Sequence, residues 1–290
     1  MLLRPGDRVA VVAPSGPVPP GRIEAGCALL RSFGLDVLLG AHVRDRDRYL
    51  AGRDEDRAAD LQRAWCDPGV RAVICARGGY GSTRLLPLLD WPALAGAGPK
   101  LLHGSSDVTA LHGAFAARLG VATSFGPMPA GDVLTAGEPD AASLASLRAA
   151  WFGGRLDLTG TDTLRPGEAR GPVVGGNLSL LCAALGTPYA GPTAQDAIAL
   201  LEDVGEQPYR VDRMLTQLLQ VGWFDGVTGV VLGGFIACGD GVEETLAERL
   251  LPLGVPVLAG VDVGHGPTQL TVPLGVDAVL DAGDRVLSFA

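Results

Sequence analysis

The feature that most constrains the fold of this chain is the repeated alternation of short apolar runs with stretches of helical periodicity. Residues 8–14, with the sequence RVAVVAP, form an uninterrupted apolar run that ends in a Ser-Gly-Pro turn. Residues 21–33 then place apolar side chains at helical spacing. Strands that alternate with helices predict a parallel, doubly wound sheet that binds ligands at the carboxyl ends of its strands. Similar apolar runs recur at residues 36–39, 72–76, 101–102 and 121–125.

The alternation weakens between residues 130 and 169 into glycine, proline, aspartate and threonine, with one helical piece near residues 141–151. We therefore predict an N-terminal α/β domain over residues 1–135 and a linker over residues 136–169. A smaller C-terminal α/β domain is expected over residues 170–290. Its strands should be mixed, because the tail alternates apolar and turn residues as antiparallel strands do.

Composition and charge restrict the class of partner. The 290 residues are 47% hydrophobic and 19% charged, which is typical of a globular protein with a sizeable core. The formal net charge is -9, and no lysine or arginine cluster is long enough to follow a phosphate backbone. Nucleic acid is thus not expected as a partner, and a small substrate is favoured.

The sequence also indicates the compartment. Arg4, Asp7 and Arg8 interrupt what would have to be the apolar part of a signal peptide, and no apolar run approaches the ~20 residues of a membrane helix. We expect a soluble, cytoplasmic protein without a membrane partner. Its five cysteines are odd in number and contain no CxxC pair, so neither a disulfide nor a zinc site is expected.

A candidate nucleophile lies in residues 100–120, KLLHGSSDVTALHGAFAARLG. The stretch predicts a strand, a sharp turn at Gly104 and a helix. Such a turn exposes a side chain beside the first amides of the helix, which can stabilise an anion. Ser105, Ser106 and Asp107 are equally suited to cap the helix, and this stretch alone favours the cap.

A second candidate element is the glycine turn Arg77-Gly78-Gly79-Tyr80-Gly81-Ser82, which follows the apolar run at residues 72–76. Glycines at a strand end let backbone amides approach a ligand closely. An ordinary tight turn between a strand and a helix explains the segment equally well. The turn has neither the Gly-Lys-Ser/Thr of a P-loop nor the GxGxxG spacing of dinucleotide-binding proteins.

An acid and a histidine each follow an apolar run in the second half of the chain. Glu202 and Asp203 close the run at residues 197–201, and His265 follows another run and a glycine. A serine nucleophile needs a base to take its proton, and the imidazole needs an acid to orient it. Ser106, His265 and Glu202 can fill these roles. A salt bridge from the acids to one of two arginines on the next predicted helix is the competing interpretation: Arg210 or Arg213.

The other three histidines fit structural positions. His103 and His112 flank the serine turn in positions that favour packing. His42 lies in a polar stretch of alternating arginine and aspartate, which indicates a solvated loop.

Several motifs in a fixed order resemble the LD-carboxypeptidases, a family that includes muramoyltetrapeptide carboxypeptidases and microcin C immunity peptidases. The resemblance covers nearly the whole chain. Its motifs are VAPSG ending at Gly16, RGGYG at 77–81, GSSDVTALH at 104–112, GGNL at 175–178, LEDVGEQPYRVDRML at 201–215 and GH at 264–265.

The resemblance implies a Ser-Glu-His triad, with Ser106 as nucleophile, Glu202 as acid and His265 as base. It also implies an anion hole formed by the backbone amides of Gly79 and Asp107. The family fold has an N-terminal α/β domain and a C-terminal domain with the active site between them, and its members are commonly homodimers.

This chain departs from the family next to the nucleophile. Ser105 stands where the family usually carries tyrosine or histidine. The departure leaves the reaction unchanged but alters the expected shape of the pocket.

The resemblance implies removal of the terminal D-alanine from a murein tetrapeptide by cleavage after an L-centre, during wall recycling. No cofactor or metal is called for, since a serine attacks and backbone amides stabilise the oxyanion. Arg77 and Arg210 are candidates to bind the substrate carboxylate, because arginine binds carboxylates through paired hydrogen bonds. Tyr80 and Asn177, which lie in the glycine motifs, are further candidate substrate-binding residues.

Two other functions stay open. The same triad can act on a peptidyl-nucleotide, as in a microcin C-type immunity peptidase. A two-domain protein can also bind a small ligand in its cleft without chemistry.

Overall fold

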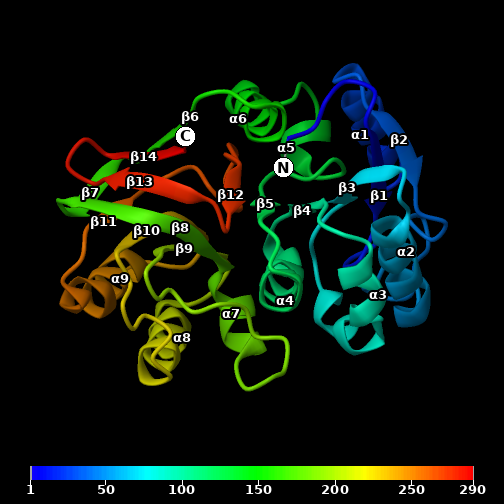
Figure 1. Cartoon of the computed structure of the whole chain (residues 1–290). Helices are drawn as coiled ribbons and strands as arrows, with labels where there is room; N and C mark the ends of the chain where they lie inside the picture. Colours follow the sequence, from blue (N-terminus) through cyan, green and yellow to red (C-terminus); the bar gives the residue numbers. More distant parts are fainter. Residues whose placement is uncertain (1, 290) are drawn as a thin grey trace.

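The N-terminal half of the computed structural model, which describes residues 2–289, is built on a six-stranded sheet (Figure 1). Its order is β12-β5-β4-β3-β1-β2, and all pairings are parallel except that of β12 with β5. The strands are β1 (Arg8–Val12), β2 (Asp36–Leu39), β3 (Val70–Cys75), β4 (Leu101–Gly104), β5 (Thr123–Phe125) and β12 (Val272–Leu274).

Helices cover both faces of this sheet, as the doubly wound prediction requires. Successive strand residues point to opposite faces, so Val9 and Val11 pack in one core while Ala10 and Val12 pack in the other. The first core contains side chains of α1 (Arg22–Ser32), α5 (Asp132–Thr135) and α6 (Ala141–Phe152), and the second those of α2 (Asp54–Cys66), α3 (Trp91–Gly96) and α4 (Thr109–Leu119).

The C-terminal half is built on an eight-stranded mixed sheet of order β6-β14-β13-β8-β9-β10-β11-β7. Its centre, β8 to β11, is parallel, and the outer pairings are antiparallel. The strands are β6 (Leu156–Thr159), β7 (Asp162–Arg165), β8 (Glu168–Asn177), β9 (Ile198–Val204), β10 (Gly229–Ile236), β11 (Val257–Ala259), β13 (Asp277–Asp281) and β14 (Val286–Phe289). Its helices are α7 (Leu178–Ala184), α8 (Pro208–Gln220) and α9 (Val242–Leu250). The predicted two-part α/β fold is confirmed.

The connection between the halves differs from the expected linker. Residues 136–169 contain α6 and the edge strands β6 and β7, which are too short and too rich in threonine and aspartate to stand out in the sequence. Strand β12 lies in the C-terminal sequence but pairs with β5 of the smaller sheet. Phe125 and Val272 of that sheet share a core with Leu200 and Val231 of the larger one, so the two halves are packed together.

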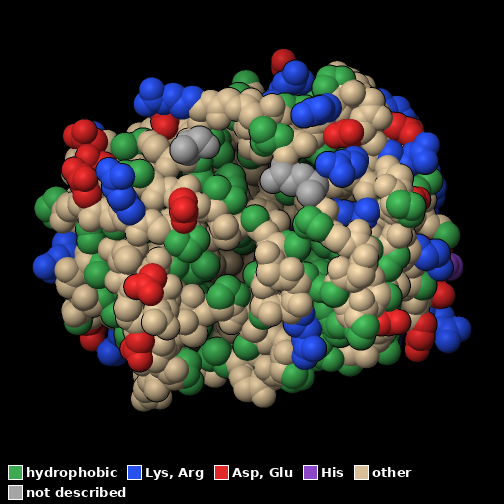
Figure 2. Space-filling model, in the orientation of Figure 1, with side chains coloured by type: hydrophobic (Ala, Val, Ile, Leu, Met, Phe, Trp, Pro, Cys, Tyr) green, Lys and Arg blue, Asp and Glu red, His purple; other side chains and the backbone are tan. Residues whose placement is uncertain are grey.

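The surface carries both signs of charge. On the face shown in Figure 2, acidic and basic side chains are interspersed, without a continuous basic band. Among residues 2–289, no helix combines the length and the apolar character needed to cross a bilayer.

One buried arginine holds two loops of the N-terminal half together. Arg57 on α2 is 2% exposed. Its guanidinium donates to the carbonyl oxygens of Pro14 and Gly81, at 3.1 Å for Gly81, and pairs with Asp54. Because these carbonyls belong to the loop after β1 and to the glycine turn after β3, Arg57 fixes both turns at the carboxyl edge of the sheet.

We expect Arg57→Leu to lower the free energy of unfolding by about 3 kcal/mol, because it removes one partner of a buried ion pair and leaves buried carbonyls without a donor. Urea denaturation measures this change. The control is Arg53→Leu, since Arg53 is 74% exposed and pairs with Glu55 at 3.6 Å; it should change stability by less than about 0.5 kcal/mol. Equal losses of stability in the two variants would contradict the conclusion that Arg57 fixes the two turns.

Candidate active site

Ser106 occupies a strained turn between β4 and α4. Its φ of 60° lies in the left-handed region that serine rarely adopts, and such strain is typical of functional sites. A single turn of 3-10 helix, Ser106–Val108, then leads into α4. Opposite the turn, a Cβ at Gly78 would lie 2.9 Å from the Ser106 Cβ, so only glycine allows the glycine turn to approach this closely.

The structure brings Ser106, His265 and Glu202 into one hydrogen-bonded chain. His265 Nδ1 lies 2.7 Å from Glu202 Oε2, and His265 Nε2 lies 2.9 Å from Ser106 Oγ. A carboxylate can only accept, so Nδ1 carries the proton and the neutral ring presents the Nε2 lone pair to the serine hydroxyl. This is the arrangement that a serine nucleophile and its base require.

Glu202 is fully buried near the end of β9. The salt bridge to Arg210 or Arg213 is not formed, because Arg210 on α8 pairs with Glu206 at 3.4 Å and Arg213 stacks over Tyr209. Glu202 therefore relies on His265 and on a side-chain amide, that of Asn177, whose Nδ2 donates to Glu202 Oε1 at 3.2 Å.

The surroundings of His265 raise the pKa of its imidazole above the usual 6.5. Burial lowers the pKa, but the hydrogen bond to Glu202 and the charges of Glu202 and Asp203 outweigh it. Burial also raises the pKa of the neighbouring Asp203 carboxyl, against three hydrogen bonds that lower it. The imidazole is thus held by a negative environment that favours its protonated form.

Asp107 connects the turn at Ser106 to both neighbouring loops. Its buried carboxylate accepts the hydroxyl of Ser15 at 2.6 Å and the amide of Ser82 at 2.8 Å. The Ser82 hydroxyl donates back to the Asp107 carbonyl at 2.6 Å. Ser15 and Ser82 were not predicted as site residues, although both lie in or beside the glycine motifs. The backbone amides of Gly79 and Asp107 have no acceptor among residues 2–289.

A pocket of about 630 Å³ opens beside the hydrogen-bonded Ser106, His265 and Glu202. It is lined by Ser105, Ser106, Gly79 and His265, and its other ionisable side chains are Arg77 and Asp132. Arg77 donates to the Pro17 carbonyl at 3.0 Å and has no acidic partner among the described residues.

The remaining sequence candidates lie outside this pocket wall. Tyr80 is 50% exposed and packs edge-on against Tyr49. Arg210 is half exposed and paired with Glu206. Asn177 is buried behind Glu202.

Two serines of α6 hold the loop that carries His265. The hydroxyl of Ser143 accepts the amide of Gln269 at 2.8 Å, and that of Ser146 accepts the amide of Thr271 at 3.1 Å. Both serines are buried. They lie in the expected linker, where nothing in the sequence pointed to a role at the site.

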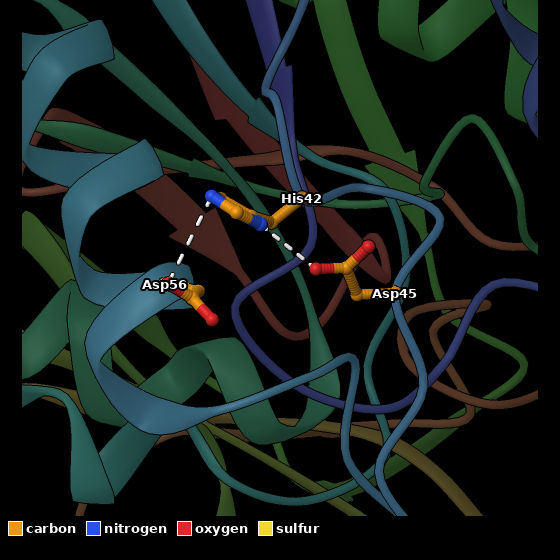
Figure 3. Close-up of side chains that lie close together, drawn as sticks. All are labelled: His42, Asp45 and Asp56. Carbon is orange, nitrogen blue, oxygen red and sulfur yellow. Dashed lines mark hydrogen bonds and ion pairs between the residues drawn. The ribbon is translucent and has the colours of Figure 1, made fainter.

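The other histidines do not take part in the hydrogen bonds that join Ser106, His265 and Glu202. His103 and His112 are buried, and burial lowers the pKa of His103 to about 3 and that of His112 to about 4, so both are neutral packing residues. His42 Nδ1 lies 2.8 Å from Asp45, and Nε2 lies 3.8 Å from Asp56 (Figure 3). Each carboxylate faces one nitrogen of the ring, and one ligand atom from each of the three residues lies within 4.8 Å of the other two. Among the described residues, nothing further marks this partly exposed cluster as a metal site, since clustered acidic groups at a surface are common without an ion.

Two α/β halves meet at a hydrogen-bonded serine, histidine and glutamate, an arrangement that is typical of serine hydrolases. The family model of the LD-carboxypeptidase N-terminal domain matches residues 9–126, and that of the LD-carboxypeptidase C-terminal domain matches residues 170–280. The chain therefore belongs to the LD-carboxypeptidase family, and it is a hydrolase with carboxypeptidase activity.

Individual relatives cover nearly the full length. A proposed carboxypeptidase of Streptomyces coelicolor is 53% identical over 99% of this chain and 94% of its own. The murein tetrapeptide carboxypeptidase of Pseudomonas aeruginosa is 36% identical over 96% of this chain and 94% of its own. The solved structure of the microcin C7 self-immunity protein MccF with aspartyl sulfamoyl adenosine has a TM-score of 0.88 and 25% identity, covering 100% of this chain and 97% of that one.

We expect Gly264→Ala to abolish most hydrolysis. A Cβ at this position, where φ is 106°, would lie 2.2 Å from Glu202 Oε2 and would displace the carboxylate from His265. Gly254→Ala is the matched control, since φ is 75° there but no atom lies within 4 Å of the added Cβ. The control should cost about 1 kcal/mol of stability and keep its activity. Comparable activity of the two variants in a hydrolysis assay would contradict the need for this close approach.

Proposed function

We propose that this enzyme removes the terminal D-alanine from murein tetrapeptides, by hydrolysis of the amide between an L-centre and the D-residue. The observation that carries the proposal is the hydrogen-bonded Ser106, His265 and Glu202 beside a pocket that also holds Arg77, which has no acidic partner among residues 2–289. The similarity to the murein tetrapeptide carboxypeptidase of Pseudomonas aeruginosa supports the choice of substrate.

In the first half of the reaction, Ser106 Oγ attacks the carbonyl carbon of the scissile amide. Its proton moves to His265 Nε2, which already lies 2.9 Å away. Glu202 fixes the ring and balances the imidazolium charge. The amides of Gly79 and Asp107 donate to the developing oxyanion, which is why their lack of internal acceptors matters.

In the second half, His265 returns this proton to the amide nitrogen, the carbon–nitrogen bond breaks, and D-alanine leaves. The peptide remains as an ester of Ser106. Water then attacks the ester, giving a proton to His265, and the serine oxygen leaves and takes that proton back. The products are the tripeptide and D-alanine, and the enzyme is restored.

Arg77 is the group that makes the enzyme a carboxypeptidase in this proposal. Its guanidinium lies on the pocket wall and has no acidic partner among the described residues, so it can bind the free carboxylate of the D-alanine. Arg210 is less suited, because it already pairs with Glu206 and does not line the pocket.

A microcin C-type immunity peptidase, which cleaves a peptidyl-nucleotide amide, is the second candidate. The likeness to MccF with aspartyl sulfamoyl adenosine favours it, since the fold matches over the whole chain. A non-catalytic binding protein would not need Ser106 and His265 within hydrogen-bond reach, so their 2.9 Å separation disfavours that third candidate.

We also propose that the enzyme works in the cytoplasm, as a homodimer. All five cysteines have free thiols, and four of them are buried, which fits a reducing compartment. The dimer is supported by the family resemblance.

The proposed function predicts release of D-alanine from a tetrapeptide ending in D-alanine and little release of L-alanine from its L-terminated counterpart. The rate should be the same with and without EDTA, because serine and backbone amides supply the nucleophile and the oxyanion contacts. Free alanine is quantified for each peptide and for a peptidyl-adenylate. Cleavage of the peptidyl-adenylate alone would favour the immunity peptidase, and comparable release of L-alanine would rule out the proposed specificity.

Two serine variants accompany this assay. Ser106→Ala should abolish turnover with the fold retained, whereas Ser105→Ala should keep measurable turnover. The cap suggested by the sequence is not formed, because neither serine side chain caps the 3-10 turn or α4 and Ser106 Oγ faces His265 instead, so activity rather than stability separates the two variants. The reverse result would assign the nucleophile to Ser105.

We expect Glu202→Gln to lower turnover by roughly two to four orders of magnitude, and Asp203→Asn to lower it far less. The base must be neutral, so kcat/KM of the wild type should fall as the pH drops through a pKa above 6.5. Without the Glu202 charge, burial remains and the acid limb should move to lower pH. The pH profiles of both variants test this. Similar losses of turnover and similar shifts of the acid limb in the two variants would contradict the assignment of Glu202 as the acid.

A further inference from the structure

Asn177 lies behind the site, where it touches both carboxylates at the end of β9. It is the last residue of β8 and the N-cap of α7, it is 3% exposed, and it is not part of the pocket wall. Its Nδ2 donates to Glu202 Oε1 at 3.2 Å and to Asp203 Oδ1 at 3.0 Å. One amide group thus uses both of its protons on two adjacent buried acids.

The orientation of this amide is fixed by its oxygen. Asn177 Oδ1 accepts the Ser179 hydroxyl at 2.7 Å and the Leu180 amide at 3.2 Å. Both partners are donors toward Oδ1, so the oxygen must face the helix and the nitrogen must face the acids. The start of α7 therefore aims the two N–H groups at Glu202 and Asp203.

The backbone of Asn177 connects this amide to the nucleophile turn. Its N–H donates to Thr109 Oγ1 at 3.1 Å, and Thr109 begins α4 three residues after Ser106. The contacts close a ring that runs from Ser106 to His265, Glu202, Asn177 and Thr109, then back along the chain to Ser106. The ring crosses between the two halves of the molecule twice.

We propose that Asn177 is a positioning residue for the reaction: it holds the Glu202 carboxylate in the plane that His265 needs, and it ties that carboxylate to the helix of the nucleophile. A buried carboxylate bound at only one oxygen could rotate toward Asp203. The second hydrogen bond prevents this rotation and separates the two like charges. The proposal rests on the proposed roles of Ser106, His265 and Glu202, and not on the identity of the peptide.

Two other roles make different predictions. A residue that only caps α7 can be replaced by serine without loss, since serine and asparagine are comparable N-caps. A residue that binds substrate, as the sequence suggested, should affect binding rather than the chemical step. Asn177→Ser separates all three roles, because serine can cap the helix but is too short to reach the acids.

The test uses the full-length enzyme and an alkyl fluorophosphonate. Ser106 Oγ attacks the phosphorus, fluoride leaves, and the serine proton passes to His265, so the maximal labelling rate reports activation of the serine without any natural peptide. We expect Asn177→Ser to lower this rate about ten- to a hundredfold, as loss of a hydrogen bond to a charged group implies, with unchanged half-saturating probe concentration. The control is Asp90→Ser, which likewise replaces an N-cap residue by serine, at the start of α3. It should label within twofold of the wild type.

A second pair of variants tests the ring without changing Asn177. Thr109→Val removes the acceptor hydroxyl at nearly constant shape, and Thr109→Ser keeps it. We expect the valine variant to label several-fold more slowly and the serine variant to recover most of the rate. Circular dichroism melting shows whether each variant is folded. If Asn177→Ser does not fold, the comparison of the two Thr109 variants tests the proposal in its place.

Three results would overturn the proposal: labelling of folded Asn177→Ser within twofold of the wild type, a raised half-saturating concentration at an unchanged maximal rate, or equal rates for the two Thr109 variants. Failure of the wild type to release D-alanine while it still labels at Ser106 would count against the proposed substrate alone. A wild type that does not label at all would overturn both proposals.

Discussion

The burial of a negative charge at Glu202 is the constraint on which the rest of the site depends. A carboxylate without solvent is unfavourable unless donors surround it. Here one donor is His265 and the other is the amide of Asn177. Gly264 leaves room for the carboxylate, since any side chain there would occupy the position of its oxygen. The same burial that makes the charge costly also makes its hold on the imidazole strong, because little water competes for it.

The second requirement is that elements of two separate sheets meet with hydrogen-bond precision. Ser106 follows a strand of the smaller sheet, and Glu202 lies near the end of a strand of the larger one. The loop with His265 connects them, since it leaves the larger sheet at β11 and enters the smaller sheet as β12. Ser143 and Ser146 of α6 bind the amides of this loop from the side. The histidine is therefore held at both ends of its loop by different halves of the molecule.

Local patterns sufficed to predict much of this. The apolar runs and their turns predicted the parallel sheet, and the positions of Ser106, Glu202 and His265 after such runs brought them to the carboxyl edges of strands. Contacts across the chain could not be foreseen, because they depend on how elements pack and not on spacing. Asn177 lay in a glycine motif and was expected to touch substrate, yet its amide is turned toward the acids by the cap of α7. Arg210 likewise lay beside the acid in sequence, but α8 directs it to Glu206.

The substrate side of the site is simpler than its support. Apart from His265, the ionisable side chains of the pocket wall are Arg77 and Asp132, and Asp132 is paired with Arg22 at 2.5 Å. Arg77 is thus the cation available to a carboxylate, and its backbone neighbours Gly78 and Gly79 form the wall next to Ser106. In the proposed mechanism, the turn after β3 both holds the end of the peptide through Arg77 and supplies an oxyanion contact through the amide of Gly79. In that proposal, the separation of these two groups along the turn sets how far from its free carboxylate a peptide is cut, and so accounts for the removal of one terminal residue.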